Sequence, residues 1–418
     1  MKYANSIKYM NSFPVAESGA DISQKRISEL CMLLGRVNIG TRYICLPSGE
    51  SGHASAILLE AIIEKAGLRV GRICSEFSFD SRESVYINKK IPTIEDYNKS
   101  VDALHSAIEK MNDKNFCREE VSFALSLLLC KLYDCDIVIL EGTTNADYSL
   151  DSICAPYDLI VIPTAYEIDG ANEIIKPLCD NIRRGVREVI TGNQRSDVYN
   201  SISNSCAMSG VRLYIPVKSQ FEVIEASLKK LAFSYGGRDG YSMRSPSYIL
   251  RDAAILCIET ALAIRRAGVK IPWSAIQGGL CEASGMSCFD LISASPILVT
   301  DSAKSREEVT LLLKTLDSLA VDCDKLAICL PFESIDLLKS QLLAFEGRNL
   351  DRILILTDEE VDVSALSLDC DNIQELKALK NCAKSAVEAS RHYDGVICFG
   401  SVDFAEKIKT EILKIMSF

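Results

Sequence analysis

The chain has 418 residues, of which 48% are hydrophobic and 25% charged, and its formal net charge is −11. This length exceeds one ordinary domain, so we expect two or three domains, and the composition is that of a folded protein rather than a disordered one. An acidic chain does not attract the phosphate backbone of a nucleic acid, so we expect no nucleic-acid partner.

The same composition indicates where the protein works. Residues 1–14 lack the apolar core of a secretion signal, and the most apolar stretch, 123–140, is interrupted by Lys131, Asp134 and Asp136. We therefore expect a cytoplasmic protein that does not bind a membrane. None of the 17 cysteines forms a C-x-x-C pair and most lie in apolar runs, so we expect them to be reduced and buried.

Short β-branched runs alternate with helical segments in the first part of the chain. The expected strands are residues 42–46, 69–75, 136–140 and 159–163, and the expected helices are 54–66, 119–132 and one that ends near residue 184. This alternation predicts a parallel sheet with helices on both faces.

A second series of the same kind follows a long helix predicted over residues 249–267. Its expected strands are residues 296–300, 325–330, 352–357 and 395–400, with a helix over 307–319. We place the domain boundary in the Gly-, Ser- and Cys-containing stretch 278–288, which gives domains of residues 1–287 and 288–418.

The loop after the first strand is the first candidate site. Glycines in such a loop let peptide N–H groups face a phosphate, a lysine reaches its outer oxygens, and the next Ser or Thr holds Mg²⁺. Gly49, Gly52 and Ser55 fit that scheme, but His53 stands at the lysine position and Glu50 adds a negative charge. A like charge about 4 Å from a phosphate costs about 4 kcal/mol at an effective dielectric near 20. An ordinary strand-to-helix turn explains the loop equally well.

Several segments follow one another in an order that resembles a known family. They are G-E-S-G-H-A-S at 49–55, A-G-L-R-V-G-R-I-C-S-E-F-S at 66–78, E-S-V-Y-I-N-K at 83–89, V-I-L-E-G at 138–142, D-S-A-K-S-R at 301–306 and G-S-V-D-F-A-E at 400–406. In folylpolyglutamate synthase and dihydrofolate synthase, members of the Mur ligase superfamily, the corresponding motifs include G-T-N-G-K-G-S, A-G-x-x-V-G-x-x-x-S-P-H-L, E-R-I-x-I-N-G and D-G-A-H-N-P. The chain resembles this family over nearly its whole length.

The resemblance implies an α/β fold and a chemistry. Residues 1–287 would form a parallel-sheet, P-loop-type Mur ligase ATPase domain, and residues 288–418 a smaller Rossmann-like C-terminal domain. In the family, ATP phosphorylates a folate carboxylate and the amine of glutamate attacks the acyl phosphate, with Mg²⁺ neutralising phosphate charge.

The family's site residues can be carried over to matching positions of this chain. Cofactor binding would fall on Gly49, Gly52, His53 and Ser55, and the metal would be held by Ser55, Glu141 and Glu167. A carboxylate such as Glu167 at the third position suits a hard cation.

The catalytic candidates and the clearest departures from the family lie partly in the second domain. Asp301 and Lys304 are the catalytic candidates, and Lys304 replaces the histidine of the family motif. His53 replaces the loop lysine and Phe77 the histidine of S-P-H-L. The segment 180–186 offers arginines where the family has a carbamylated lysine. The family's arginine is missing from 287–290, and its nucleotide-contacting glutamine from 249–253.

Three hypotheses remain open. The first is a folylpolyglutamate synthase-like protein that lacks ATP-dependent glutamate ligation and acts as a binding or regulatory homologue, with a protein partner such as an active ligase. The second is an active acid–amino-acid ligase with a rebuilt site. The third is an unrelated α/β protein that binds a small molecule. The expected ligand is folate-like or another carboxylate, and the cofactor is Mg-ATP if the protein is active and none otherwise.

Overall fold

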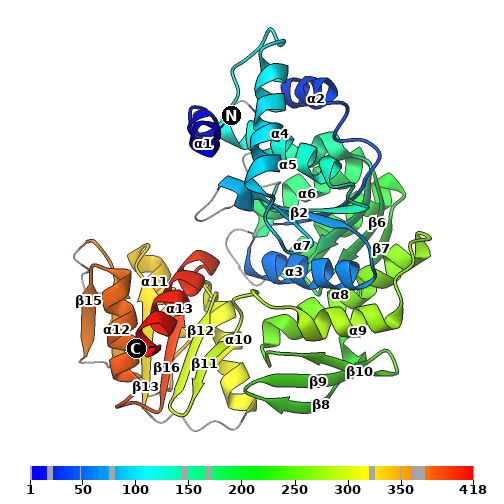
Figure 1. The fold of residues 1–418 in the computed structure, drawn as a ribbon. Helices are drawn as coiled ribbons and strands as arrows, with labels where there is room; N and C mark the ends of the chain where they lie inside the picture. The colour runs from blue at the N-terminus through cyan, green and yellow to red at the C-terminus, as the bar shows by residue number, and fades with distance from the viewer. Residues whose placement is uncertain are drawn as a thin grey trace. The chain divides into compact units, whose positions relative to one another are not determined.

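The structure, a computed structural model, describes residues 2–16, 22–47, 49–74, 81–143, 149–165, 171–319, 325–348, 350–359, 361 and 372–417. Its contacts divide the chain into two units (Figure 1). Unit 1 comprises Met1–Lys218 and Ala253–Ala283, and unit 2 comprises Ser219–Asp252 and Ser284–Phe418. In this division Ser219–Asp252 group with the later part of the chain, and the domain boundary at residue 287 stays a prediction.

Unit 1 is built on a seven-stranded sheet with the strand order β3-β2-β4-β1-β5-β6-β7. All neighbouring strands are parallel except β3, which runs antiparallel to β2. The strands are β1 (Arg42–Leu46), β2 (Val70–Cys74), β3 (Val85–Ile87), β4 (Ile137–Glu141), β5 (Tyr157–Ile162), β6 (Val186–Thr191) and β7 (Arg212–Tyr214). The strand predicted over residues 42–46 forms with those bounds, and the other three predicted strands form with boundaries shifted by one or two residues.

Helices cover this sheet on both faces, as the alternating pattern predicts. On one side α3 contacts β2 and β4, and on the other α5 contacts β2 and β3 (Figure 1). The helices of unit 1 are α1 (Tyr3–Met10), α2 (Gln24–Leu33), α3 (Glu50–Lys65), α4 (Ile94–Ile108), α5 (Arg118–Leu132), α6 (Ala171–Arg184), α7 (Ser196–Ser209), α9 (Trp273–Glu282) and most of α8 (Tyr248–Arg266).

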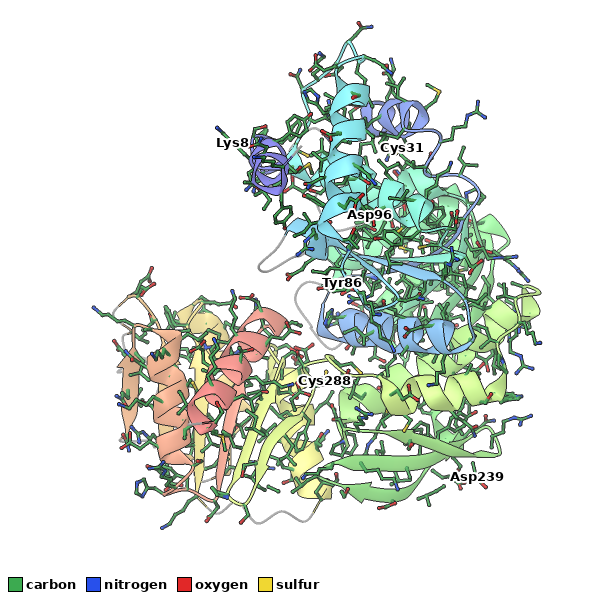
Figure 2. The ribbon with its side chains drawn as sticks, in the orientation of Figure 1. Lys8, Cys31, Tyr86, Asp96, Asp239 and Cys288 are labelled. Atoms are coloured by element: carbon green, nitrogen blue, oxygen red, sulfur yellow. The ribbon has the colours of Figure 1, made fainter. Side chains whose placement is uncertain are left out.

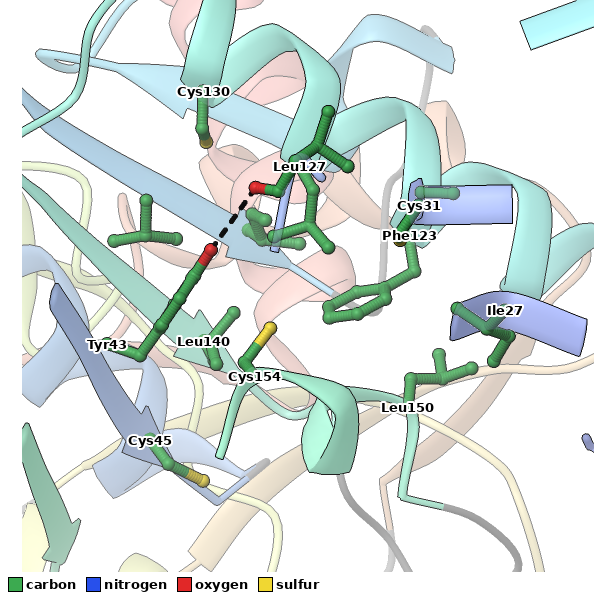
Figure 3. Close-up of a cluster of buried hydrophobic side chains, with 14 of the residues drawn as sticks. Ile27, Cys31, Tyr43, Cys45, Phe123, Leu127, Cys130, Leu140, Leu150 and Cys154 are labelled. Atoms are coloured by element: carbon green, nitrogen blue, oxygen red, sulfur yellow. Dashed lines mark hydrogen bonds between the residues drawn. The ribbon is translucent and has the colours of Figure 1, made fainter. Parts of the chain in front are cut away.

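Cysteines contribute to the core between the sheet and α5 (Figure 3). Cys31, Cys130 and Cys154 are buried there among leucine, isoleucine and phenylalanine side chains, close to the buried ring of Tyr43. The hydroxyl of Tyr43 donates a hydrogen bond to the carbonyl oxygen of Val37 over 3.4 Å. All the cysteines that the structure describes are free thiols, and most are buried. They act as small apolar side chains, as the sequence predicts.

Unit 2 contains a six-stranded sheet with the order β11-β12-β16-β13-β14-β15, parallel except for β11. Its strands are β11 (Asp290–Ala294), β12 (Ile297–Asp301), β13 (Leu326–Pro331), β14 (Leu350–Leu356), β15 (Ile373–Leu376) and β16 (Gly395–Phe399). One face packs against α10 (Arg306–Ser318) and α11 (Ile335–Leu343), and the other against α12 (Leu379–Ala389) and α13 (Val402–Met416).

A small antiparallel sheet completes unit 2, with the order β10-β9-β8. It consists of β8 (Phe221–Ser227), β9 (Lys230–Tyr235) and β10 (Arg238–Met243). The rings of Phe221, Phe233 and Tyr241 stack across it, with centroids 4.5 Å and 5.4 Å apart. The α/β fold with parallel sheets is thus observed, with one antiparallel addition. No helix within the described residues is long and apolar enough to cross a membrane.

Candidate functional site

The candidate loop lies where several strands of the first sheet end together. Leu46 at the end of β1 pairs with Glu141 at the end of β4, and Cys74 at the end of β2 pairs with the same residue. The carboxyl ends of parallel strands are the usual place for ligands in open α/β sheets. The sequence prediction therefore puts the loop and Glu141 at the same sheet edge, and the structure brings them together.

The turn between β1 and α3 is short, and its glycines are required by its backbone. Gly49, which precedes the helix, has a φ of +101°, a conformation that costs other residues free energy. A Cβ atom at Gly52 would collide with the carbonyl oxygen of Pro47. The peptide N–H of His53 already bonds to the carbonyl of Gly49 over 2.8 Å. The first turn of such a helix offers N–H groups to an anion, so the backbone alone is compatible with phosphate.

Ser55 is placed in the helix interior rather than at the strand ends. The residue is fully buried, and its hydroxyl donates to the carbonyl oxygen of Ser51 over 2.7 Å. The thiol of Cys257 on α8 lies 3.3 Å from the carbonyl oxygen of Ser55 and packs behind it. A metal ion could use the Ser55 hydroxyl only if that hydroxyl turned away from Ser51.

Glu141 is held by two basic side chains. One carboxylate oxygen lies 2.7 Å from Nδ1 of His53, and the other accepts a hydrogen bond from Nη1 of Arg72 over 2.6 Å. Burial alone would raise the pKa of Glu141, but the charges of His53 and Arg72 outweigh burial and hold this pKa at about 2. Because an ionised carboxylate only accepts hydrogen bonds, Nδ1 of His53 must carry the hydrogen.

Arg72 contacts the candidate site, and sequence analysis did not single it out. Its Nε donates to Glu60 on α3 over 2.8 Å, and its guanidinium lies 4.5 Å from the ring centroid of Tyr86. Figure 2 shows Tyr86 on the strand that flanks β2. Burial disfavours the charge on Arg72, but the neighbouring groups, including Glu141 and Glu60, more than compensate and raise its pKa.

A signal for this network was present in the sequence. Arg72 lies in the apolar strand Val70–Cys74, and Glu60 lies in the apolar helical run 57–63. A charged side chain in a buried element needs a partner of opposite charge, so two such residues on neighbouring elements form a natural pair. The family motifs specify neither residue: Glu60 lies outside them, and Arg72 falls at an unspecified motif position.

The described residues do not fit the implied Mg²⁺ site. Both oxygens of Glu141 are engaged, and the Ser55 hydroxyl bonds within its helix. A divalent cation about 4 Å from the Arg72 guanidinium would be repelled by about 8 kcal/mol at an effective dielectric near 20. Among the described residues, no group of three His, Cys, Asp or Glu side chains is arranged to hold a metal.

Three predicted features lie outside the described residues. They are Glu167, the third proposed metal ligand, Phe77, and the side chain of Glu50. The assignments of Glu167 as a ligand and of Glu50 as a repulsive charge therefore stay predictions.

Asp301, a catalytic candidate, is placed at the end of β12 in unit 2. Its carboxylate is buried and accepts the peptide N–H groups of Phe289 over 2.6 Å and of Ala303 over 2.7 Å. Burial raises the pKa of Asp301 to about 7, although the two N–H donors act in the opposite direction. Phe289 has a φ of +52°, which is strained for a bulky side chain, so Asp301 stabilises an unusual backbone segment.

Lys304, the second catalytic candidate, lies in the loop before α10. Its ammonium is 2.8 Å from Oε2 of Glu333, and both side chains are partly exposed. A partly exposed ion pair is weak, so the ammonium can leave it at little cost. The structure thus places Asp301 at the end of β12 and Lys304 in the loop that follows it, and their catalytic roles stay predictions.

The arginine run at the end of α6 is engaged locally. Arg183 pairs with Asp180 over 2.6 Å and donates to Ser205 over 3.2 Å, while Arg184 donates to Asn181 over 2.8 Å. These contacts are those of a helix end whose arginines bond to neighbouring side chains.

Comparisons with known proteins agree with this arrangement. No family model matches the chain. The folylpolyglutamate synthase of Lacticaseibacillus casei is 23% identical over 337 residues, which cover 76% of this chain and 77% of that protein.

Solved structures of the same enzyme share the fold over nearly the whole chain. A Mycobacterium tuberculosis folylpolyglutamate synthase complexed with ADP and AMPPCP has a TM-score of 0.80 at 17% identity, covering 98% of both chains. The apo form of the L. casei enzyme has a TM-score of 0.79 at 17% identity, covering 99% of this chain and 100% of that one. A complex of such an enzyme with AMPPCP and folate gives the same TM-score and coverage.

These similarities bear on the hypothesis of an unrelated α/β protein. The predicted α/β fold of the Mur ligase type is confirmed, and the similarity to folylpolyglutamate synthase counts against an unrelated α/β binding protein. The chain therefore has the fold of folylpolyglutamate synthases, and it is similar in sequence to the L. casei enzyme over about three quarters of its length.

Proposed function

We propose that this chain is a folylpolyglutamate synthase homologue that lacks ATP-dependent glutamate ligation and acts as a binding or regulatory protein. The observation that carries the proposal is the state of Glu141, whose two oxygens are held by Arg72 and His53. Phosphoryl transfer is catalysed mainly by preorganised positive charge around the γ-phosphate. Here the nearby positive charge is already paired with protein carboxylates.

The loop supports the same proposal. A lysine would place an ammonium at the phosphate oxygens, whereas His53 directs Nδ1 to Glu141. The second nitrogen of His53, Nε2, is buried and has no hydrogen-bond partner in the described part of the chain. An imidazole in this position does not replace a lysine as a donor to several phosphate oxygens.

The ligand that we propose is folate-like or another carboxylate. Support comes from the related enzyme in complex with AMPPCP and folate, since a retained fold preserves a binding surface more readily than a reaction. Titration calorimetry with folate and dihydrofolate tests this part. A dissociation constant of about 100 µM or tighter would support it, and no heat of binding with either compound would contradict it.

A protein partner belongs to the same proposal, and an active ligase of the same family is the candidate. Co-elution of the two purified proteins on size exclusion, compared with each protein alone, measures such an association. Separate elution at concentrations of about 50 µM would argue against a regulatory complex.

The alternative function is an active ligase of the folylpolyglutamate synthase type with a rebuilt site, using Mg-ATP. It is favoured by Lys304, whose ammonium sits in a weak ion pair with Glu333 and could serve another anion. Asp301 would then help to position that loop.

Mass spectrometry of a reaction with a folate, glutamate and Mg-ATP separates the two functions. Our proposal expects no product longer by one glutamate. If such a product forms and Lys304→Ala abolishes it while Lys339→Ala on α11 does not, the alternative is correct.

A further inference from the structure

We infer that Arg72 and His53 take the place of a divalent cation at Glu141, so that this protein does not bind a metal at the end of β4. The inference rests on the proposed function, because it gives a physical reason for the absence of ligation. It concerns a property of the free protein, however, and needs no turnover to be tested.

The contacts of Glu141 already supply what a metal ion would supply. A cation neutralises a carboxylate and fixes its orientation. Here Nη1 of Arg72 lies 2.6 Å from one oxygen, and Nδ1 of His53 lies 2.7 Å from the other. Glu141 is only 8% exposed, so little of its surface is left for a further ligand.

Arg72 is fixed in this position and cannot readily make way for an ion. Its Nε is bound to Glu60, its guanidinium stacks on Tyr86, and its backbone lies in a strand between β3 and β4. A guanidinium keeps its charge at all ordinary pH values, so deprotonation offers no escape. An incoming divalent cation would face a permanent positive charge next to Glu141.

Glu60 uses both of its carboxylate oxygens in hydrogen bonds within the protein. One of its oxygens binds Arg72, and the other accepts the peptide N–H of Lys89 over 2.6 Å in the turn after β3. Glu60 is 1% exposed. Both buried carboxylates thus bond to Arg72, Glu141 also lies within hydrogen-bond distance of His53, and the network joins α3, β2, β4 and that turn into one unit.

The test is a titration of the full-length protein with Mn²⁺ at pH 7.5, without nucleotide. Electron paramagnetic resonance reports the free ion, and Mn²⁺ stands in for Mg²⁺ because it prefers the same oxygen ligands. We expect no saturable binding below about 1 mM. One bound Mn²⁺ per chain with a tighter dissociation constant, lost in Glu141→Gln, would overturn the inference.

A charge-balanced variant tests the role of Arg72 directly. Glu60→Gln together with Arg72→Met removes one ion pair, keeps the apolar stem, and frees one oxygen of Glu141. We expect Mn²⁺ to bind at least about tenfold more tightly to this variant than to the native chain. Adding Glu141→Gln should abolish that gain.

The results of these experiments test the inference separately from the proposed function. A folded double variant without any gain would show that Arg72 does not exclude the metal. If the double variant fails to fold, the titration of the native chain and of Glu141→Gln still decides. Ligase turnover without Mn²⁺ binding at Glu141 would refute the proposed function and leave this inference standing.

Discussion

Arg72 shows how a single buried charge can define a site. Its side chain is almost fully buried and bonded to carboxylates from α3 and β4, so it is tied to elements far apart in sequence. Removing one member of a buried ion pair leaves the other charged and unsolvated, which costs more than the pair contributes. The residue is therefore important to stability as well as to the chemistry of Glu141.

Substitution of Arg72 by methionine should destabilise unit 1 strongly. We expect a loss of about 3–5 kcal/mol, because Glu60 and Glu141 would be left buried without a cation. Urea unfolding followed by far-ultraviolet circular dichroism measures the change. Arg69→Met is the matched control, since the Arg69–Asp134 pair is exposed and should contribute no more than about 0.5 kcal/mol. Equal effects of the two substitutions would contradict the buried network.

Stability in acid should depend on Glu141. Its pKa is about 2 in the folded protein and near 4.5 when unpaired, so the unfolded chain takes up the proton first as pH falls. The stabilisation, on the order of 3 kcal/mol, is present above about pH 4.5 and is lost as pH falls toward 2. Glu141→Gln should be less stable at pH 6 and should show a smaller loss between pH 5 and pH 3. An identical pH dependence of the urea midpoint in both proteins would contradict this assignment.

Two side chains of the loop should make its binding of nucleotide weak. We expect a dissociation constant for Mg-ATP weaker than about 100 µM, because Glu50 carries a negative charge and His53 is directed at Glu141. Glu50→Thr with His53→Lys should strengthen binding in isothermal titration, whereas His105→Lys on α4 should not. A low-micromolar dissociation constant of the native protein for Mg-ATP at pH 7.5 would show that the loop still binds phosphate.

Among the helices of unit 1, α3 and α9 pack closely against each other. A Cβ atom at Gly279 would lie 2.5 Å from the Cα of Ile62, so only glycine lets the two backbones approach. The neighbouring Gly278 faces only the flexible stem of Lys65, whose nearest atom would be 3.1 Å away. These adjacent residues on one helix therefore have different reasons for being glycine.

Alanine substitutions at these two positions should have opposite effects. Gly279→Ala should cost about 1–3 kcal/mol through overpacking, whereas Gly278→Ala should be neutral or stabilising by up to about 1 kcal/mol because alanine favours a helix. Thermal unfolding of the two variants in parallel measures this difference. If Gly279→Ala melts at or above the temperature of Gly278→Ala, the helix contact is looser than the structure indicates.

Elements with a clear hydrophobic pattern could be predicted from the sequence, and those without one could not. The buried strand β1 was predicted at Arg42–Leu46, where it forms, because its apolar residues are flanked by turn residues. By contrast, β8 is an edge strand with almost no buried residue, so its sequence carries no burial pattern. The candidate loop was found from its glycines, but Arg72 was not, because its partners come from other elements.

At the scale of the whole molecule, fold and activity are separate questions. The chain shares the fold of folylpolyglutamate synthases over 98–99% of its length at only 16–18% identity with the solved structures. Packing tolerates such divergence because many apolar substitutions preserve a core. Phosphoryl transfer tolerates it poorly, because the loss of one electrostatic contact can slow a reaction roughly 10²–10³-fold. A retained fold together with a Glu141 that is already paired supports our proposal that this chain does not catalyse ligation.

The most direct test of this account is the release of ADP by the native protein with a reduced folate, glutamate, ATP and Mg²⁺. A coupled assay should detect no ADP release that depends on glutamate, while the L. casei enzyme serves as the active control. Glutamate-dependent release faster than about one per second, a rate typical of working enzymes, would contradict the account. That result would mean that the site has been rebuilt around other cations, and a loss of turnover in Lys304→Ala would identify Lys304 as one of them.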